Sequence, residues 1–281
     1  MQRNRVSGST LCTRRDGAMR MYLELAKRSF QQQFAYRAAT MAGLFTNSIF
    51  GVMLSSVYLA LYWDKPDGTS VEGFTAQQTV TYTWIGQAMI MPVIFWGWWL
   101  IIDTIRTGAV VMDFLKPMDY FRYWLSRDLG RAAAQVITRG LPTLLIGALL
   151  FDLVWPDSWQ RWAAFLASVP FAVTVSFCLR FMMNLWGFWL LDHRGISSMM
   201  LVVSGVFSGH LLPIAWYPAP IRDVINVLPF RSMLMTPVEI WLGQVSIAYG
   251  LFLQMFWAAV MIGASYALLH VAERKVVVQG G

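Results

Sequence analysis

The chain has 281 residues, of which 57% are hydrophobic and only 13% are charged. A soluble domain carries roughly a quarter of charged residues, and a soluble core of this size cannot bury so much apolar surface. The composition therefore excludes an ordinary soluble protein and indicates a polytopic membrane protein, in line with the mean hydropathy of +0.50. The net charge of +7 reflects an uneven placement of basic residues along the chain, so it does not require nucleic acid as a partner.

The N-terminal residues 1–19 are polar and basic and contain no apolar run, so they do not form a cleaved signal peptide. They are predicted to be a disordered basic leader, and Met19 and Met21 are alternative starts of the protein. One domain boundary is therefore predicted at residue 19.

Residues 20–37 form the next predicted element, an amphipathic helix. Leu23, Ala26, Phe30 and Phe34 recur at helical spacing near one face, with polar and basic residues opposite. Directly before a span, this pattern predicts an interfacial helix lying flat on the cytoplasmic surface. The alternative is a positive flank that only orients the first span.

Long apolar runs after residue 37 predict about six spanning helices, since a helix needs ~20 apolar residues to cross the hydrocarbon layer. Transmembrane strands are excluded because they are ~10 residues long and alternate in polarity. The predicted fold class is all-α integral membrane, with one six-span domain at 38–275 and a tail at 276–281. The predicted spans are 38–62, 79–102, 133–155, 162–190, 196–213 and 245–270.

The basic residues fix the predicted orientation, because Lys and Arg in short loops stay preferentially in the cytoplasm. The N-terminal stretch, the loop between the second and third predicted spans and the C-terminus are all basic. Both termini are therefore predicted to be cytoplasmic. The opposite side holds only Lys65, Arg161, Arg222 and Arg231.

The loop at 104–131 is more apolar than a simple connector needs to be. Gly108 and Pro117 bracket a short predicted helix, and Asp119 is placed to cap the next one. This pattern predicts a cytoplasmic knob with an apolar tip that docks into a partner's groove. The tip consists of Val110, Val111, Phe114 and Leu115, flanked by Arg106, Asp113 and Lys116.

The segment at 213–243 is broken by prolines, which forbid one continuous helix. Its apolar pieces are each too short to span, and they fit short re-entrant helices that enter the outer leaflet and return. A loop lying on the surface is the alternative.

Sites of chemistry are mostly absent from the sequence. No segment matches the phosphate-binding pattern G-x-x-x-x-G-K-[ST], and no Cys or His spacing is typical of a metal site. His193, His210 and His270 are scattered over different helix ends, and Cys12 and Cys178 are placed too differently to form a disulfide. The chain is therefore predicted not to be an enzyme and to hold no cofactor or metal.

Arg180 is the one strong charge clearly inside a predicted span, where a charged residue is costly. It lies toward the inner end of a long span, so snorkelling to the interface is the simpler interpretation. The alternative is an inner-gate ion pair or a contact for an anionic group of a substrate.

The sequence resembles the ABC-2 type permeases, the membrane subunits of ABC exporters, and within them the small six-span subfamily with a separately encoded ATPase. The resemblance covers nearly everything after residue 20. The most specific part of it is the order of Gly209, Pro213, Pro218, Pro229, Phe230 and Gly243. The motifs are "MRMYLELAKRSFQQQFAYRA", "IRTGAVVMDFLKPMD" and "FSGHLLPIAWYPAPIRDVINVLPF" followed by "PVEIWLG".

This resemblance implies different roles for different segments of the chain. Residues 20–37 would be a connecting helix, and 105–117 a coupling helix that presses on the ATPase subunit. The coupling residues would be Arg106, Thr107, Gly108, Asp113, Phe114, Leu115, Lys116 and Pro117. The family loop often carries an acidic residue after its Thr-Gly pair, whereas Ala109 stands here.

The same resemblance implies that residues 214–243 close the pathway on the outside. The outer-gate residues would be Gly209, Pro213, Pro218, Pro229, Phe230, Glu239 and Gly243, with Arg180 as the possible inner gate. ATP and magnesium would bind the ATPase partner, and a second permease chain, identical or a sister, would complete the pathway in the cell membrane.

The implied function is export of an amphipathic or hydrophobic substrate, and residue types do not distinguish a drug, a lipid or a small peptide. A non-transport scaffold or a channel subunit is the competing interpretation. A secondary transporter is disfavoured because the sequence shows no clear repeat and no carboxylate in the middle of a predicted span.

Overall fold

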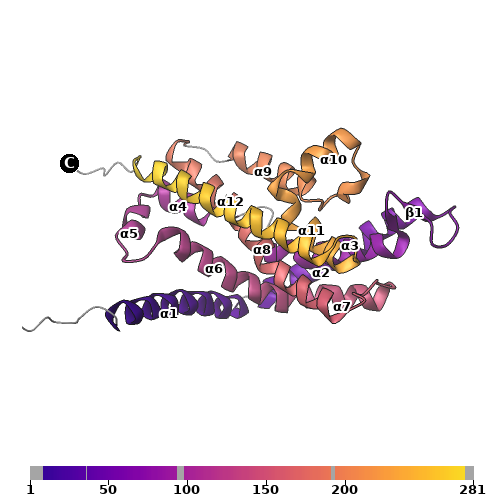
Figure 1. Ribbon diagram of the computed structural model, residues 1–281, viewed down its shortest axis with the longest axis horizontal. Helices are drawn as coiled ribbons and strands as arrows, with labels where there is room; N and C mark the ends of the chain where they lie inside the picture. Colours follow the sequence, from indigo (N-terminus) through magenta and orange to yellow (C-terminus); the bar gives the residue numbers. More distant parts are fainter. Residues whose placement is uncertain (1–8, 36, 94–97, 191–193, 276–281) are drawn as a thin grey trace, which may run out of the picture.

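The computed structural model describes residues 9–35, 37–93, 98–190 and 194–275 and shows an elongated bundle of helices (Figure 1). The fold is all-α, as predicted, apart from one short antiparallel hairpin of β1 (Ser70–Val71) and β2 (Phe74–Thr75). The long helices are α1 (Ser9–Gln32), α2 (Arg37–Leu59), α3 (Ala76–Val93), α6 (Tyr120–Gln135), α7 (Leu141–Leu150), α8 (Trp159–Leu185), α9 (Arg194–Phe207) and α12 (Ile247–Glu273). The shorter ones are η1 (Gln33–Ala35), η2 (Ala60–Tyr62), α4 (Leu100–Arg106), α5 (Val110–Phe114), the π-helix η3 (Val136–Gly140), η4 (Trp186–Phe188), η5 (Ile214–Trp216), α10 (Ala219–Asn226), η6 (Pro229–Met233) and α11 (Met235–Leu242).

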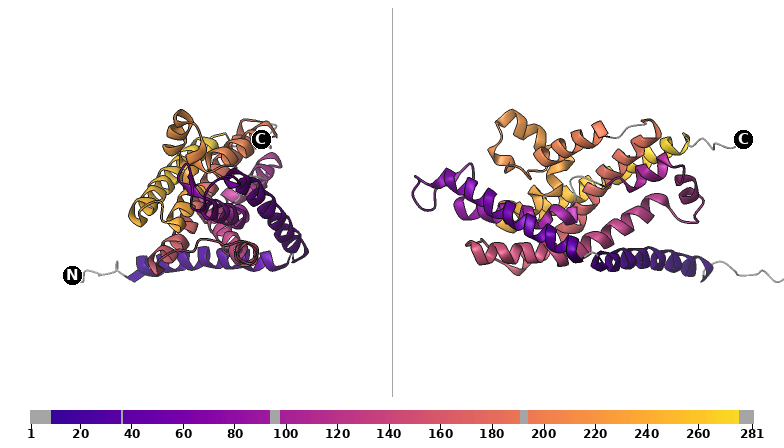
Figure 2. Two further views of the ribbon diagram at one scale, coloured as in Figure 1. Left: turned by 90° about the vertical axis from the view of Figure 1, so that its right-hand side faces the viewer. Right: turned by 180° about the vertical axis from the view of Figure 1, so that it is seen from behind.

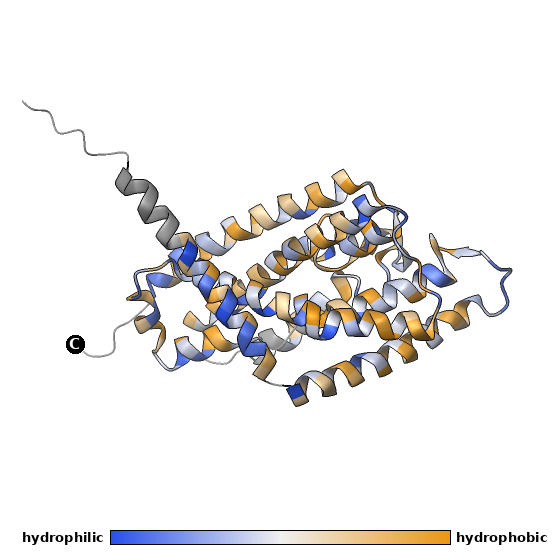
Figure 3. Cartoon of the chain, turned by 90° about the horizontal axis from the view of Figure 1, so that it is seen from below, coloured by the Kyte–Doolittle hydropathy of each residue, from blue (hydrophilic) through white to orange (hydrophobic). Residues whose placement is uncertain are grey.

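Four helical segments among the described residues are long and apolar enough to cross a membrane. The hydropathy colouring shows extensive orange on the helices of the bundle and a blue loop beside the short strands (Figure 3). They are Arg37–Tyr62, Tyr120–Leu150, Trp159–Phe188 and Ile247–Glu273.

Three of the predicted spans end earlier than predicted, those at 79–102, 133–155 and 196–213. The helix predicted at 79–102 is not continuous, because α3 is described as far as Val93 and the separate helix α4 begins at Leu100. The helix that Asp119 is predicted to cap begins at Tyr120 and leads into the span predicted at 133–155, and the Asp119 side chain accepts a hydrogen bond from the Arg122 amide at 2.7 Å.

That helix continues through the π-helix to Leu150, and the π-helix accommodates Pro142 in the next turn. The helix predicted at 196–213 stops at Phe207, because Gly209 turns the backbone with a φ of +75°. The predicted tail at 276–281 and His193 lie outside the described residues, and so does the side chain of Cys12.

The two ends of the bundle carry different structures (Figures 1 and 2). α4, α5, the start of α6 and the end of α12 lie at one end, on the left of Figure 1, and we call it the α5 end. The β1–β2 hairpin and the end of α7 lie at the other, which we call the hairpin end.

Helix α1 lies beside α6 (Figure 1) and packs closely against it. Ser29 donates a hydrogen bond to the Arg127 carbonyl at 2.7 Å, and Gly130 lies directly against the backbone of Ala26. Small residues allow this close approach. The side of α1 that packs against α6 is therefore the one with Ala26 and Ser29.

This arrangement corrects the prediction that the whole leader is disordered. Leu23 of α1 and Phe34 of η1, assigned with Ala26 to one apolar face, are exposed. The helix also begins at Ser9 and not at residue 20, so the helical part of the predicted leader is not disordered. Residues 9–19 contain no proline, and nothing in their backbone chemistry ends a helix there.

We expect Gly130→Ala to lower the free energy of unfolding by ~1 to 3 kcal/mol, as overpacking does. A Cβ at this position would lie 2.0 Å from the Ala26 carbonyl oxygen, so α1 and α6 must separate. Thermal unfolding in detergent measures the effect. Gly263→Ala in α12 is the matched control, because a Cβ there meets no atom within 4 Å; equal stability of the two variants would contradict the close packing.

Candidate functional site

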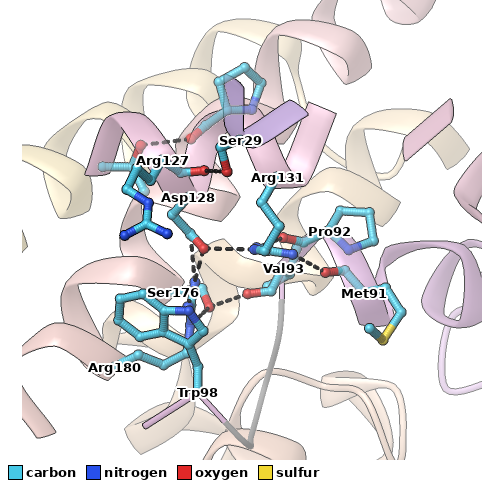
Figure 4. A network of polar contacts seen from close by, with 12 residues as sticks. Ser29, Met91, Pro92, Val93, Trp98, Arg127, Asp128, Arg131, Ser176 and Arg180 are labelled. Atoms are coloured by element: carbon cyan, nitrogen blue, oxygen red, sulfur yellow. Dashed lines mark hydrogen bonds and ion pairs between the residues drawn. The ribbon is translucent and has the colours of Figure 1, made fainter. Parts of the chain in front are cut away.

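A buried carboxylate, Asp128 of α6, lies between two guanidinium groups near the α5 end (Figure 4). Arg180 of α8 approaches it at 2.7 Å, and Arg131 of α6 approaches it at 2.8 Å. The Asp128 side chain is fully buried, and Arg180 is 4% exposed. Both charges are thus removed from solvent and compensated by each other.

The structure overturns the interpretation that Arg180 snorkels to the interface. Its guanidinium stays inside the bundle, paired with Asp128 and 5.2 Å from the centre of the Trp98 ring. The ion-pair alternative is therefore the one that the geometry supports. The sequence predicts that Asp119 caps the helix containing Asp128, but it does not single out Asp128, because the local pattern does not show that this carboxylate faces α8.

The same cluster of side chains also stabilises the end of α3, before α4 begins. Arg131 donates hydrogen bonds to the carbonyl oxygens of Met91 at 2.7 Å and Pro92 at 2.8 Å, and Ser176 of α8 donates to that of Val93. The last carbonyls of a helix have no partner within the helix. Here a cation and a hydroxyl satisfy them, so α3 is tied to both α6 and α8.

Asn184 of α8 fixes the beginning of α4 in a similar way. Its amide group donates to the Trp98 carbonyl at 3.0 Å, and its side-chain oxygen accepts from the Ile102 amide at 3.0 Å. Gly187 leaves room for the Ile102 side chain, which a Cβ would approach to 2.5 Å. The segment that follows α4 and contains α5 is thereby anchored to α8.

The chain turns between α4 and α5 at Gly108, whose φ of +75° disfavours any residue with a side chain. Thr107 donates to the Asp103 carbonyl at 2.8 Å, while Arg106 and Pro117 are exposed at either side of α5. Asp113 pairs with Lys116 at 2.5 Å, and this hydrogen bond raises the pKa of Lys116. The turn thus presents α5 as a compact knob.

The composition of the apolar tip differs from the prediction. Val110 is 3% exposed, and the Phe114 ring packs on Tyr120 at a centroid distance of 4.8 Å. The exposed apolar residues are Leu115, at 72%, and Met112, at 66%. Phe114 therefore anchors the knob to the bundle, and Met112 and Leu115 form its surface.

At the hairpin end, two tyrosines donate hydrogen bonds to backbone carbonyl groups just after the end of α9. Tyr82 of α3 donates to the Gly209 carbonyl at 2.5 Å, and Tyr58 of α2 donates to that of Leu211. Broken backbone is tolerated at membrane depth only when protein or water satisfies it. Pro213 and Pro218 then precede η5 and α10, and Pro229 begins η6.

The segment from η5 to α11, which we call the cap, is held together by internal polar contacts. Arg231 approaches Glu239 at 2.6 Å and Asn226 at 2.7 Å, and Gly243 ends α11 in the left-handed conformation with a φ of +75°. Phe230 packs on Phe207 at 5.7 Å between centroids. These short helices agree with the predicted break-up of 213–243.

Hydrogen bonds also connect the cap to the loops of the hairpin end. The Trp216 indole donates to the Val71 carbonyl at 3.2 Å, and the Trp241 indole donates to that of Val154 at 2.7 Å. The cap is therefore packed against both loops and is not a loose surface loop.

The predicted site residues thus form two groups at opposite ends of the bundle, and Arg180 lies with the coupling group. Asp128, Arg131, Ser176 and Asn184 complete that group, and none of them was predicted. Among the described residues, no group of His, Cys, Asp and Glu is arranged to hold a metal ion.

Comparison with protein families finds a match to the ABC-2 family transporter proteins over residues 51–280. The chain belongs to this family. Comparison with curated proteins finds no match. The protein is accordingly a transmembrane permease component of an ABC transporter, a family that generally lacks an ATPase site of its own.

In this permease, we expect Asp128→Asn to cost ~3 to 5 kcal/mol of stability, because it leaves buried guanidinium groups without a countercharge. Expression level and thermal unfolding in detergent measure the loss. Asp67→Asn is the matched control, because Asp67 is exposed in the loop of the hairpin end. Equal behaviour of the two variants would show that the buried carboxylate is dispensable.

Proposed function

We propose that this permease is the membrane half of an exporter whose ATP-hydrolysing subunit binds at the α5 end. Two permease chains enclose the pathway, which carries an amphipathic or hydrophobic substrate out through the cell membrane. ATP and magnesium bind the partner subunit, and both termini of the permease lie in the cytoplasm.

The observation that carries this proposal is the construction of α5. Its exposed surface is apolar at Met112 and Leu115, while Val110 and Phe114 fix it to the bundle. An exposed apolar tip on a fixed support suits insertion into a groove of a partner. A push on this tip passes through α4 to Asn184 of α8.

Helix α1 supports the role of a connecting helix. One side is packed on α6, and Met19, Leu23 and Phe34 remain exposed. An amphipathic helix with such residues partitions into the interface, where its apolar side chains enter the lipid. α1 would then hold the α5 end at the membrane surface.

The cap supports closure on the outer side. It contacts the loops after α2 and α7 through Trp216 and Trp241. A movement of the cap would therefore move both loops with it and open this end of the pathway. Outward transport follows if this end faces outside, as the distribution of basic residues indicates. Met, Phe and Trp side chains adapt to irregular apolar cargo.

The double variant Met112→Ser with Leu115→Ser should weaken coupling more than tenfold, because burying each apolar side chain contributes ~1.5 to 3 kcal/mol. The protein should still insert, since α5 lies at the end of the bundle. Co-purification of a nucleotide-binding subunit from gently solubilised membranes and substrate-stimulated ATP hydrolysis measure the effect.

Leu145→Ser with Leu149→Ser on α7 is the matched control, because both leucines are exposed but distant from the α5 end. An assembled complex of the α5 variant with undiminished stimulation would contradict coupling through this tip. A wild-type chain that recovers no nucleotide-binding subunit would favour the scaffold or channel interpretation.

Single cysteines test the orientation, in a background with Cys12→Ser and Cys178→Ala. A cysteine at the exposed Gly68 should react fast with an impermeant reagent added outside, and one at the half-buried Asn226 more slowly. A cysteine at Leu115 should react only after permeabilisation. Labelling of Asn226 from the cytoplasm alone would reverse the proposed orientation.

A further inference from the structure

A cavity of about 150 Å³ lies between α1, α6 and the beginning of α4. It is several times larger than the ~30 Å³ that one water molecule occupies in the liquid. The cavity is open to the outside of the bundle, and α1 forms one of its walls. Its lining residues are Ser29, Gln32, Gln33, Trp98, Leu100, Trp124, Arg127, Asp128 and Arg131.

Positive charge is in excess around this cavity. Arg127 and Arg131 line it, Arg180 lies directly behind Asp128, and Asp128 is the one carboxylate of the lining. Asp128 is already shared by Arg131 and Arg180. Arg127 forms no ion pair with any residue of the described ranges, although it is partly removed from solvent.

The position of Arg127 is fixed without a countercharge. Its guanidinium lies 4.9 Å from the centre of the Trp124 ring and 5.5 Å from that of Tyr123, and it donates to the Tyr123 hydroxyl at 3.2 Å. Two aromatic faces and one hydroxyl hold the group, and most of its five N–H donors are left for another acceptor. A guanidinium presented in this way matches a phosphate group, which it can bind through two parallel hydrogen bonds.

The other lining residues suit the same ligand. Gln32 at the end of α1 and Gln33 of η1 bring amide groups that can donate to phosphate oxygens. Leu100, which is half exposed, gives one side of the cavity an apolar edge. A ligand with a charged head and an apolar body is therefore favoured over a free anion.

From this geometry we propose that the cavity binds the phosphate headgroup of an anionic phospholipid, with Arg127 as the main contact and the acyl chains leaving past Leu100. The chain belongs to a membrane transporter family, so phospholipid is always present around it. Exposed apolar residues of α1 and η1, such as Leu23 and Phe34, continue the apolar surface on which those chains would lie. Bound in this way, the lipid joins α1 to the start of α4.

The test uses the full chain, with any co-purifying subunit, equilibrated in mixed micelles of phosphatidylglycerol and phosphatidylcholine in equal amounts. Mass spectrometry of the repurified protein gives the ratio of the two retained lipids. We expect about a tenfold preference for phosphatidylglycerol, because both lipids offer the phosphate but only phosphatidylcholine adds a choline cation, which the excess positive charge of Arg127, Arg131 and Arg180 repels. Arg127→Gln should abolish the preference, and Arg127→Lys should keep part of it.

Arg28→Gln is the matched control, because Arg28 is an exposed residue of α1 that does not line the cavity and pairs with Glu24 on the surface. It should keep the wild-type ratio. Equal retention of the two lipids by the wild type, or the same loss in Arg28→Gln as in Arg127→Gln, would overturn the site. Complete displacement of phosphatidylglycerol by excess inorganic phosphate would overturn the assignment to a lipid.

Discussion

The arrangement of the α5 end depends on one buried carboxylate. Moving a charge out of water costs several kcal/mol per ion, so Asp128 is tolerated only because Arg131 and Arg180 surround it. The two arginines come from α6 and α8, and Arg131 also holds the carbonyl end of α3. A single group thus joins three helices, and it requires all three to be in place together.

This junction explains how the break between α3 and α4 is stable in a membrane. A helix that ends within a bundle exposes carbonyl groups, and these groups need donors. Arg131 and Ser176 supply donors for α3, and Asn184 satisfies the start of α4. Because the donors belong to α6 and α8, a displacement of the coupling segment is shared with the long helices. The turn between α9 and the cap follows the same rule, with Tyr58 and Tyr82 as donors to the carbonyl groups of Leu211 and Gly209.

The sequence predicts the fold class and the two unusual segments, because hydropathy, prolines and glycines act locally. It also indicates where α6 begins, since Asp119 is placed to cap that helix. The partner of Arg180 was missed, because the contact between Asp128 and Arg180 joins two helices that are far apart in the sequence. The packed side of α5 was also unpredictable, since Phe114 and Leu115 are neighbours in a helix too short to show a periodic pattern. The small residues Ala26 and Gly130 are the signal that would have found the contact between α1 and α6.

The most direct test of the central role of Asp128 is a double-mutant cycle with Arg180. Unfolding free energies are measured for Asp128→Asn, Arg180→Gln and the double variant. Removing Asp128 leaves a buried cation behind, and removing Arg180 as well relieves this cost. The double variant should therefore be no less stable than Asp128→Asn alone. Losses that simply add would show that the two residues act independently, and would contradict a shared buried junction.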